Sequence, residues 1–521
     1  MKGIIRNQVR QQQQGVKVNL YGEITTISGE PVNHEKHLID LITHRYLREK
    51  ESLFHSLDGT YCLFIEDYSS AEVLLVRDKI GAIPIYYSLQ PGIVCWGNRI
   101  SDVLLQNESL PEINENVIHE YLVFRYVSSK NTIFKNIHEV LPGHYIKVNL
   151  DTGHVQEQAY WDIPYPQADK IFRLNEVVLV DQVEEILTKS IKTGFPQKNI
   201  HGVMLSGGVD SSLIVAIASK VYAEPLSTFF IGFKEYESDR SDDAREVSLL
   251  YDTKHSEFYL DAEQFATCLP EAIRINEEPL NHPGHVGRVL FNKHMNGRIS
   301  CLHLGEGVDT MFCGSKVYTL MRYAYQYNYL RPFTKKIFEY LPPSIVPNRY
   351  IRHYNIIREA FVSDPGEYLI KSLGVNDYDA VNKLIENKSN LGYLEYYRSF
   401  MKGCDRKNIH ERYLKLNQHP FMVEVLNSEF KFGFEYHIEN RYPFLNIDLV
   451  SFANYVPFSL RSKGFIGKYL IKKLAERYFP KGFVYRKKEG FGVPLKKYFD
   501  NPNGMGRYYD LLLDQRTMNR G

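Results

Sequence analysis

The feature that most constrains this chain is a loop of glycines and serines between a short apolar strand and a helix. The loop is Ser206-Gly207-Gly208-Val209-Asp210-Ser211-Ser212, preceded by a predicted strand over 202–205 and followed by apolar residues at helical spacing over 212–221. Glycines allow a tight turn with bare N–H groups, and a helix start adds unpaired N–H groups and the positive end of its dipole. The pattern therefore predicts a phosphate site, to which the serines add hydroxyl donors.

Asp210 lies inside this predicted phosphate site, where its negative charge would repel a phosphate. A Mg²⁺ ion that bridges the carboxylate and the phosphate oxygens removes this repulsion. The loop lacks the GxxxxGK[ST] pattern, so it is not a Walker A loop. A glycine-rich turn with a serine N-cap is the alternative, but it does not account for the whole pattern in register with a strand and a helix.

Strands and helices alternate on both sides of this loop. Apolar strands are predicted at 202–205, 228–232, 256–260 and 301–304, with helices at 212–221 and 243–251. This alternation predicts a parallel sheet with crossover helices. From about residue 315 to 480 the chain is predicted to be mostly helical.

The first part of the chain has a different pattern, of short strands broken by Gly, Pro, Asp and Asn. Strands are predicted at 16–21, 60–66, 73–76, 85–88 and 93–96, with helices at 35–48 and 115–124. This mixture is typical of an α+β domain with antiparallel sheets. Residues 160–169 carry two prolines and predict a linker. We therefore expect one domain over 1–165 and a second over 175–521.

Composition argues against several other classes of protein. Lys and Arg number 63 against 62 Asp and Glu, which argues against nucleic-acid binding through a cationic field. No apolar run reaches the length of a membrane span, and the first residues turn polar too early for a signal peptide. The 6 cysteines lie far apart without a CxxC, unlike a disulfide framework or zinc ribbon. We expect a cytoplasmic protein with no nucleic-acid or membrane partner.

The SGGxDSS loop resembles that of the pyrophosphate-loop ATPases, which release pyrophosphate and adenylate their substrate. Five further stretches resemble the glutamine-hydrolysing asparagine synthetases and their relatives, the β-lactam and carbapenam synthetases. They are RDKIGAIPIYY at 77–87, TIFKNIHEVLPGH at 132–144, GEGVDTMFCG at 305–314, ENRYPFLN at 439–446 and YRKKEGFGVPL at 485–495. The resemblance implies an Ntn-amidotransferase-like α+β sandwich, then an α/β pyrophosphate-loop ATPase domain with a parallel sheet and a helical C-terminal part.

The same resemblance implies nucleotide and metal contacts. The residues expected to bind ATP and pyrophosphate are Leu205, Ser206, Gly207, Gly208, Asp210, Ser211, Ser212, Ile231, Leu304 and Gly305. Asp309 would join Asp210 to provide two carboxylates for Mg²⁺. Capping of the following helix is the alternative role for Asp309.

Three catalytic residues are also implied. Glu306 would orient or deprotonate the incoming amine, and Lys488 would hold pyrophosphate and the oxyanion of acyl transfer. Arg486 and Lys487 are alternatives to Lys488. Glu439 would support the acyl pocket. The structural alternative is a surface glutamate for Glu306, a solvated basic run for Lys488 and a salt bridge for Glu439.

The N-terminal chemistry departs from this family. Its glutamine-using members begin Met-Cys-Gly-Ile, and the cysteine is the nucleophile, whereas Lys2 stands here and cannot form a thioester. The glutamine-binding NGEIYN motif corresponds to Tyr21–Thr26 without either asparagine, and Gly97-Asn98 replaces Ser-Glu. We expect a domain that keeps the fold and not the glutaminase activity.

The ligase half departs less. Thr310 replaces a glutamate, and the aromatic run Phe430–Phe434 replaces the family's DRxSM stretch. We expect an AMP- and pyrophosphate-forming ligase that adenylates a carboxylate and condenses it with an amine that does not come from glutamine. Its partners would be a small-molecule or peptide carboxylate and amine, as for β-lactam synthetases and lasso-peptide cyclases in antibiotic biosynthesis. Two alternative functions stay open, an ammonia-dependent synthetase and a non-catalytic ATP-binding module. Assembly into a homodimer also stays open.

Overall fold

The computed structural model describes most of the 521 residues. The described ranges are 2–6, 15–32, 37–107, 110–166, 170–173, 175–195, 200–222, 224–236, 240–330, short stretches between 333 and 376, 378–385, 392–402, 409–487, 492–501 and 503–508. Contacts divide the chain into two units: unit 1 comprises 1–174, 307–427 and 447–470, and unit 2 comprises 175–306, 428–446 and 471–521. Each unit combines segments that are far apart in the sequence, so the units do not correspond to the predicted domains. The domain ranges 1–165 and 175–521 therefore stay predictions.

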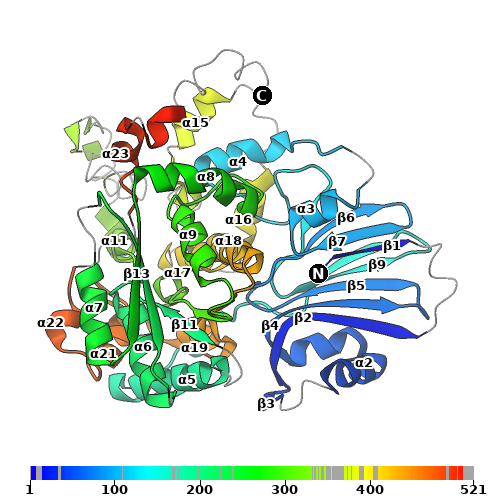
Figure 1. Ribbon diagram of the computed structural model, residues 1–521, viewed down its shortest axis with the longest axis horizontal. Helices are drawn as coiled ribbons and strands as arrows, with labels where there is room; N and C mark the ends of the chain where they lie inside the picture. The colour runs from blue at the N-terminus through cyan, green and yellow to red at the C-terminus, as the bar shows by residue number, and fades with distance from the viewer. Residues whose placement is uncertain are drawn as a thin grey trace. The chain divides into compact units, whose positions relative to one another are not determined.

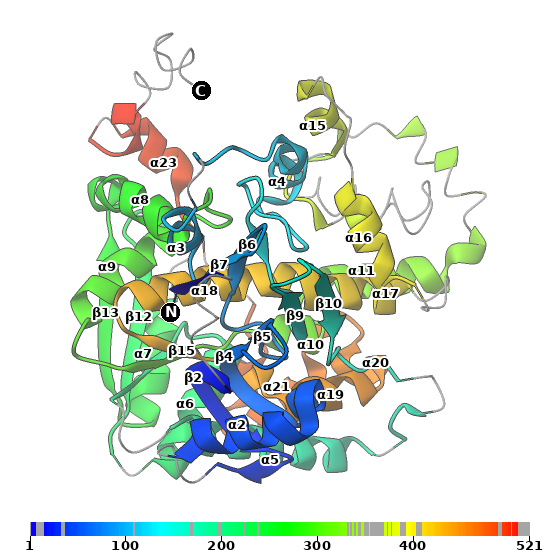
Figure 2. The ribbon, with the colours of Figure 1, turned by 90° about the vertical axis from the view of Figure 1, so that its right-hand side faces the viewer.

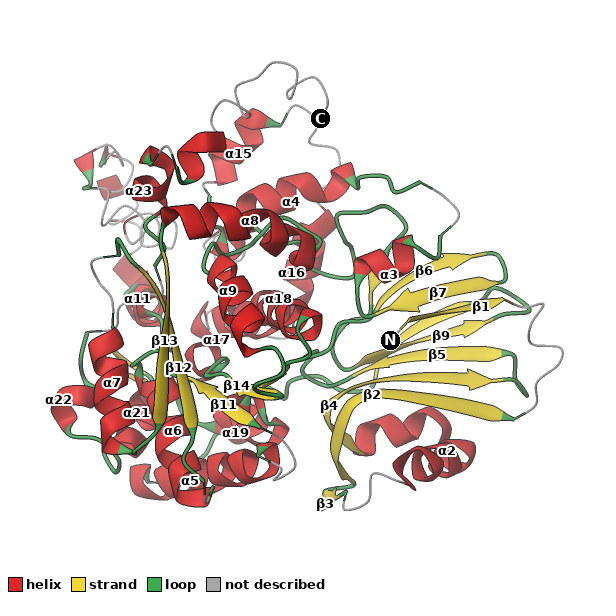
Figure 3. Cartoon of the chain, viewed as in Figure 1, coloured by secondary structure: helices red, strands yellow, loops and turns green. Residues whose placement is uncertain are grey.

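Unit 2 is built on the predicted parallel sheet (Figure 3). Its strand order is β13 (Lys254–Leu260), β12 (Ser227–Phe233), β11 (His201–Met204), β14 (Cys301–His303) and β15 (Glu439–Arg441), and every neighbouring pair is parallel. β12 is buried from Thr228 to Phe233, as expected for a parallel strand covered on both faces. β15 was not predicted, because its residues, Glu439, Asn440 and Arg441, are all polar and give no apolar run.

Helices connect these strands as crossovers. Figure 1 shows α7 and α9 on opposite sides of β12 and β13. The helices of unit 2 are α5 (Glu176–Gly194), α6 (Val209–Val221), α7 (Ser241–Leu250), α8 (Ala262–Asn276), α9 (His285–Met295), α22 (Lys481–Val484), α23 (Leu495–Asp500) and the short η8 (Pro443–Leu445) and η9 (Met505–Tyr508). Their starts follow local chemistry: Asp261 and Gln264 form a reciprocal capping box at α8, and Asn175 caps α5 by accepting from the N–H of Val178.

Unit 1 contains the predicted antiparallel sandwich. One sheet has the order β1 (Lys2–Arg6), β7 (Ile93–Gly97), β6 (Tyr86–Gln90), β8 (His138–Glu139). The other has the order β10 (Val155–Ala159), β9 (His144–Asn149), β5 (Glu72–Arg77), β4 (Leu57–Asp67), β2 (Val16–Ile27), β3 (Glu30–Pro31). Phe64 of β4 stacks on Trp96 of β7, which joins the two inner faces.

Helices cover the outer faces of this sandwich (Figures 1 and 2). α2 (Leu38–Glu49) buries Leu38, Ile42 and Tyr46, four residues apart, in a core shared with β2, β4 and β5. α3 (Ile100–Leu104) buries Ile100 and Val103 against the other sheet. The sequence predicted α2 and the strands β2, β4, β5, β6 and β7, with boundaries that shift by a few residues; β2, for example, runs to Ile27. It did not predict α3 or the strands β1, β3, β8, β9 and β10.

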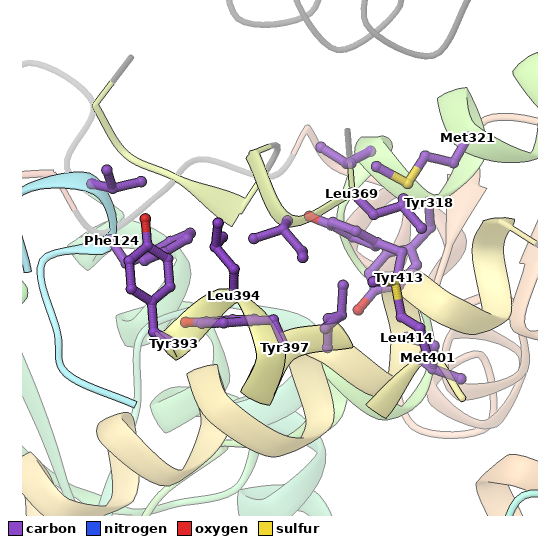
Figure 4. Close-up of a cluster of buried hydrophobic side chains, with 14 of the residues drawn as sticks. Phe124, Tyr318, Met321, Leu369, Tyr393, Leu394, Tyr397, Met401, Tyr413 and Leu414 are labelled. Atoms are coloured by element: carbon purple, nitrogen blue, oxygen red, sulfur yellow. The ribbon is translucent and has the colours of Figure 1, made fainter. Parts of the chain in front are cut away.

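The helical part of unit 1 shares a core with the first half of the chain. Its elements are η2 (Lys50–Ser56), η3 (Glu115–Val117), α4 (Ile118–Phe124), α10 (Val308–Met311), α11 (Lys316–Gln326), η5 (Asn328–Leu330), α15 (Tyr378–Leu384), α16 (Gly392–Phe400), α17 (Ile409–Leu416), η7 (Asn417–Phe421), α19 (Ile447–Tyr455), α20 (Phe458–Arg461), β16 (Ser462–Lys463) and β17 (Ile466–Gly467), while α18 (Met422–Glu435) and α21 (Tyr469–Ala475) run from one unit into the other. Figure 4 shows Phe124 of α4 beside Tyr393 and Tyr397 of α16. His119 completes this connection: its Nδ1 lies 2.8 Å from Oη of Tyr393.

Two expectations from composition can be compared with the structure. The five described cysteines, Cys62, Cys95, Cys268, Cys301 and Cys313, are buried and form no disulfide. Among the described helices, none combines the length and the apolar composition that a bilayer crossing requires.

Candidate active site

The glycine–serine loop joins β11 to α6 in unit 2, as predicted. The N–H of Leu205 still donates to the carbonyl of Phe229 in β12, at 2.7 Å, so the strand ends directly before the loop. The hydroxyl of Ser211 accepts from the N–H of Ser206 at 3.1 Å and donates to the carbonyl of Gly208 at 3.2 Å. These bonds hold the loop closed without a serine cap, because the N-cap residue of α6 is Gly208. The alternative of a serine N-cap is therefore wrong.

Gly207 allows the loop to pass close to α7. Its φ is +69°, in the left-handed region. A Cβ at this position would lie 2.6 Å from Cβ of Asp243 and 2.9 Å from the carbonyl oxygen of Arg240. Asp243 is itself held by Arg240, whose Nε donates to it at 2.6 Å, and by Arg486. The phosphate loop thus rests on the beginning of α7, and only a glycine fits.

Gly305 approaches the start of α6 closely. A Cβ at Gly305 would lie 3.3 Å from the backbone nitrogen of Ser211 and 3.4 Å from Cβ of Asp210. The backbone of Gly305 thus lies close to the start of α6, where unpaired N–H groups can bind a phosphate group. The residues here therefore fit a nucleotide phosphate, and Asp210 in the first turn of α6 fits Mg²⁺ shared with phosphate oxygens.

The two flanking serines of the loop differ in exposure. Ser206 is exposed, and its hydroxyl can reach a ligand. Ser212 is fully buried, its N–H donates to the carbonyl of Gly208 at 3.0 Å, and its hydroxyl has no hydrogen-bond partner within the described ranges. Helical periodicity turns Ser212 into the interior, so its predicted phosphate contact has no support in this geometry.

Ile231 lies where β12 extends beyond its neighbour. The β11–β12 ladder ends at the pair Met204–Phe229, whereas β12 continues to Phe233. Since backbone groups two residues apart point to the same side of a strand, Ile231 presents its N–H and C=O past the end of β11. This position agrees with the predicted contact of Ile231 with the nucleotide.

Glu306 lies at the same edge of the sheet, after β14. The N–H of Leu304 donates to the carbonyl of Arg441 in β15, at 2.9 Å, and the chain then turns through Gly305 to Glu306. In open α/β sheets ligands bind outside the carboxyl ends of the strands. Leu205, Leu304, Gly305 and Glu306 therefore share one ligand edge with the phosphate loop.

Asp309 belongs to unit 1, where a lysine pairs with it. The N-cap residue of α10 is Gly307, so helix capping is not the role of Asp309. Nζ of Lys468, next to β17, lies 2.9 Å from Oδ1 of Asp309, and the Lys468 side chain is buried. Sequence reasoning missed Lys468, because no local motif marks a lysine at this position. The joint use of Asp210 and Asp309 for Mg²⁺ stays a prediction.

The other two predicted catalytic residues are Glu439 and Lys488. Glu439 begins β15 at the amino end of the sheet, where Oε1 lies 2.9 Å from Nη2 of Arg441 and Oε2 accepts from Sγ of Cys301 at 3.7 Å. This arrangement favours the salt-bridge alternative for Glu439. Lys488 lies outside the described residues, so its role stays a prediction.

The positions that bind glutamine in the resembled family serve the fold here. The hydroxyls of Thr25 and Thr26 donate to the carbonyl and the carboxylate of Asp58, both at 3.2 Å. Asn98 is buried and donates to the carbonyl of Pro84 at 2.8 Å. Lys2 begins β1, whose pairing with β7 places it opposite Gly97. The strand framework is present, with structural hydrogen bonds at these positions.

Comparisons with known proteins agree with both halves of this description. A family model described as asparagine synthase matches residues 182–520, and one described as a glutamine amidotransferase domain matches residues 39–161. The chain is 23% identical over 473 residues to the glutamine-hydrolyzing asparagine synthetase 1 of Bacillus subtilis, which covers 88% of this chain and 71% of that protein. It is 23% identical over 278 residues to the amidase chyE of Penicillium rubens, with coverage of 50% and 41%.

The match to the second model gives the sandwich of unit 1 its identity as an Ntn-amidotransferase-like fold. The match to the first spans well over half of the chain and includes the phosphate loop and the GEGVDTMFCG stretch. The chain therefore belongs to the asparagine synthase family, whose members are ATP-dependent ligases that form carbon–nitrogen bonds.

Proposed function

We propose that this chain adenylates a carboxylic acid and joins it to an amine that is not released from glutamine, with AMP and pyrophosphate as products. The observation that carries this proposal is the loop at Gly207, which combines a left-handed glycine, an exposed serine hydroxyl and a helix start. Such a loop holds the terminal phosphates of ATP, so the α-phosphate is the one left for attack.

The first step is attack of a carboxylate oxygen on the α-phosphorus, with pyrophosphate as the leaving group. The bare N–H groups of the loop and the hydroxyl of Ser206 would stabilise the charge on the leaving phosphates. Mg²⁺ bound by Asp210 and phosphate oxygens would supply further neutralisation. Lys488 is the residue we expect to hold the released pyrophosphate.

In the second step the amine nitrogen attacks the acyl carbon, AMP leaves and the amine loses a proton. Glu306 follows β14 at the ligand edge and is the base that we assign to this proton. The enzyme would also hold the amine beside the activated carbonyl, and such pre-orientation is worth about 7–11 kcal/mol of the barrier.

The first domain bears on the source of the amine. Thr25, Thr26 and Asn98 use their polar groups for internal hydrogen bonds, and Lys2 replaces the nucleophilic cysteine. The remaining source is an amine within the acid substrate itself or within a peptide, as in β-lactam synthetases and lasso-peptide cyclases. We therefore propose a role in natural-product biosynthesis, of the antibiotic type.

A second candidate is amide formation from free ammonia. It is favoured by Glu306, since β-lactam synthetases have a tyrosine at that position, and by the GFGVPL stretch at 490–495, which they lack. Both features resemble asparagine synthetases. A primary amide would then be the product.

The test is ATP–pyrophosphate exchange with the purified chain and a library of carboxylic acids. We expect exchange, AMP formation and a product lighter than its acid and amine by one water. Asp210→Asn should lower the exchange rate by about 100-fold or more, whereas Asp242→Asn, an exposed aspartate on α7, should not. Release of glutamate from glutamine would contradict the proposed amine source, and ammonia-dependent product would favour the second candidate. No exchange with any acid would indicate a binding module.

A further inference from the structure

Four aromatic side chains lie in contact along one surface of the helical part of unit 1. Phe465 lies in the turn between β16 and β17, Tyr323 on α11, Tyr327 between α11 and η5, and Tyr329 on η5. The ring centroids of Phe465 and Tyr323 are 5.5 Å apart. Those of Tyr323 and Tyr327 are 6.4 Å apart, and those of Tyr327 and Tyr329 are 6.3 Å apart. These four residues form what we call the aromatic surface.

The aromatic surface faces solvent. Phe465 is 68% exposed, Tyr327 is 47% exposed and Tyr329 is 71% exposed. Leu330, the next residue of η5, is also exposed, and Phe333, three residues further along the chain, is 72% exposed. Single exposed apolar side chains are common on protein surfaces, whereas a group of them in contact marks a site of interaction.

The chain around this surface is basic. Residues 316–336 contain five Lys and Arg and no Asp or Glu, although the whole chain has 63 Lys and Arg against 62 Asp and Glu. Nη1 of Arg322 donates to the carbonyl of Ser462 at 3.3 Å, and Nζ of Lys463 donates to Oη of Tyr469 at 3.2 Å. Both acceptors are neutral, so they leave the positive charge uncancelled. The surface therefore suits an anionic partner.

The arrangement of the rings distinguishes between anionic partners. Single-stranded nucleic acids stack their bases on open aromatic faces. Here the rings of Tyr323 and Tyr327 are stacked on each other at an angle of 19°, and Phe465 lies against Tyr323, so the rings turn their faces to one another. A membrane interface instead takes up Tyr, Phe and Leu side chains at the level of the headgroups, while Lys and Arg extend to the phosphates. The surface therefore favours lipid.

We infer that the aromatic surface, with Leu330, Phe333 and the cations around them, binds the headgroup region of an anionic lipid membrane. The expectation of no membrane partner considered a spanning segment, whereas a peripheral site requires only apolar side chains and positive charge on one surface. The inference goes beyond the proposed function, because it concerns where the protein is held and not the reaction that it catalyses.

The experiment is co-sedimentation of the purified full chain with vesicles of two compositions. One is phosphatidylcholine alone, and the other is phosphatidylcholine and phosphatidylglycerol in equal parts. We expect the anionic vesicles to bind about 10-fold more tightly or better, because each Lys or Arg near an anionic surface adds to the attraction. Added salt should weaken this binding. No binding to the anionic vesicles, or equal binding to both kinds, would overturn the inference.

Variants identify the residues. Tyr329→Ser paired with Phe333→Ser removes two exposed rings, so the melting temperature should not change, whereas binding to the anionic vesicles should weaken by about 10-fold or more. Lys336→Glu, at an exposed lysine, should weaken it by about 5-fold or more. The matched control is Leu249→Ser paired with Leu250→Ser, two exposed leucines of α7 and its end. Unchanged binding in the aromatic double variant would refute the assignment.

Two further measurements test other partners. Binding of oligouridine that is lost in the aromatic double variant, with no binding to vesicles, would identify a nucleic-acid site. A dimer in sedimentation velocity that dissociates in the same variant, again with no binding to vesicles, would identify a contact between two copies of the chain. Either result would overturn the membrane assignment. ATP–pyrophosphate exchange without lipid should be the same in the double variant and the wild type, so this inference and the proposed function can fail separately.

Discussion

Nζ of Lys468 lies 2.9 Å from Oδ1 of Asp309, with the lysine side chain 6% exposed and the aspartate side chain 45% exposed. The lysine therefore reaches the carboxylate from the protein interior, and the other side of Asp309 faces outward. The positive charge of Lys468 stabilises the negative charge of the Asp309 carboxylate. It also places a cation next to a predicted metal ligand. Because the resemblance implies that Asp309 binds the metal of the adenylation step, we predict that loss of Lys468 weakens this step.

Lys468→Met tests this pair. We expect ATP–pyrophosphate exchange to fall by about 100-fold, since one preorganised positive group is removed. The melting temperature should fall only slightly, because half-exposed Asp309 can be hydrated. Lys463→Met, on the same β16–β17 hairpin with an exposed side chain, is the control. Full exchange activity in Lys468→Met would exclude the lysine from the step.

Gly207→Ala tests the close contact between the phosphate loop and α7. The added Cβ would lie 2.6 Å from Cβ of Asp243, so α7 or the loop must shift. Gly297→Ala provides the comparison, because Gly297 also has positive φ, +74°, but no atom within 4 Å of the new Cβ. We expect Gly297→Ala to lower the free energy of unfolding by about 1 kcal/mol and Gly207→Ala to lower it by about 1–3 kcal/mol more. Denaturant unfolding measures both; equal losses would rule out the contact.

His303 predicts a pH dependence of stability. Burial, with nearby His201 and Arg441, lowers its pKa well below the usual 6.5, and its Nε2 lies 3.0 Å from Nδ1 of His201. The unfolded chain therefore binds a proton below pH 6.5 that the folded chain does not. Stability is complete above this pH and falls as the pH decreases, by up to about 1.4 kcal/mol per pH unit.

His303→Gln should reduce this slope, as measured by urea unfolding between pH 7.5 and 5.0. The control is His154→Gln, an exposed histidine whose replacement should leave the slope unchanged. The same slope in wild type and His303→Gln would show that other groups account for the acid sensitivity.

Phe124→Ala tests the core shared by the first half of the chain and the helical part of unit 1. Phe124 of α4 is 1% exposed and stacks on Tyr397 of α16, with ring centroids 5.0 Å apart. We expect a loss of about 3–5 kcal/mol in the free energy of unfolding. Hydrogen exchange should also rise in α16 and α17. Leu105→Ala, an exposed leucine at the end of α3, should change neither quantity. If only the sandwich lost protection, the two parts would not share a core.

The sequence by itself determined the elements that depend on local pattern. The strand, loop and helix around Gly207 were predictable because glycine conformation, apolar runs and helical spacing are properties of neighbouring residues. The match of five ordered stretches predicted the family that the comparisons show. The resemblance implied that Ile231 and Glu306 belong to the nucleotide site, and the structure shows both near the carboxyl ends of parallel strands, where ligands bind in open α/β sheets.

Only the tertiary structure decided which distant residues meet. It paired Lys468 with Asp309, joined the three residues of β15 to the sheet and brought Arg288 to Glu429. None of these relationships has a periodicity or motif of its own. They arise because folding brings distant segments together, and a charged group is buried only where another segment provides a partner. No single stretch of sequence can specify that partner.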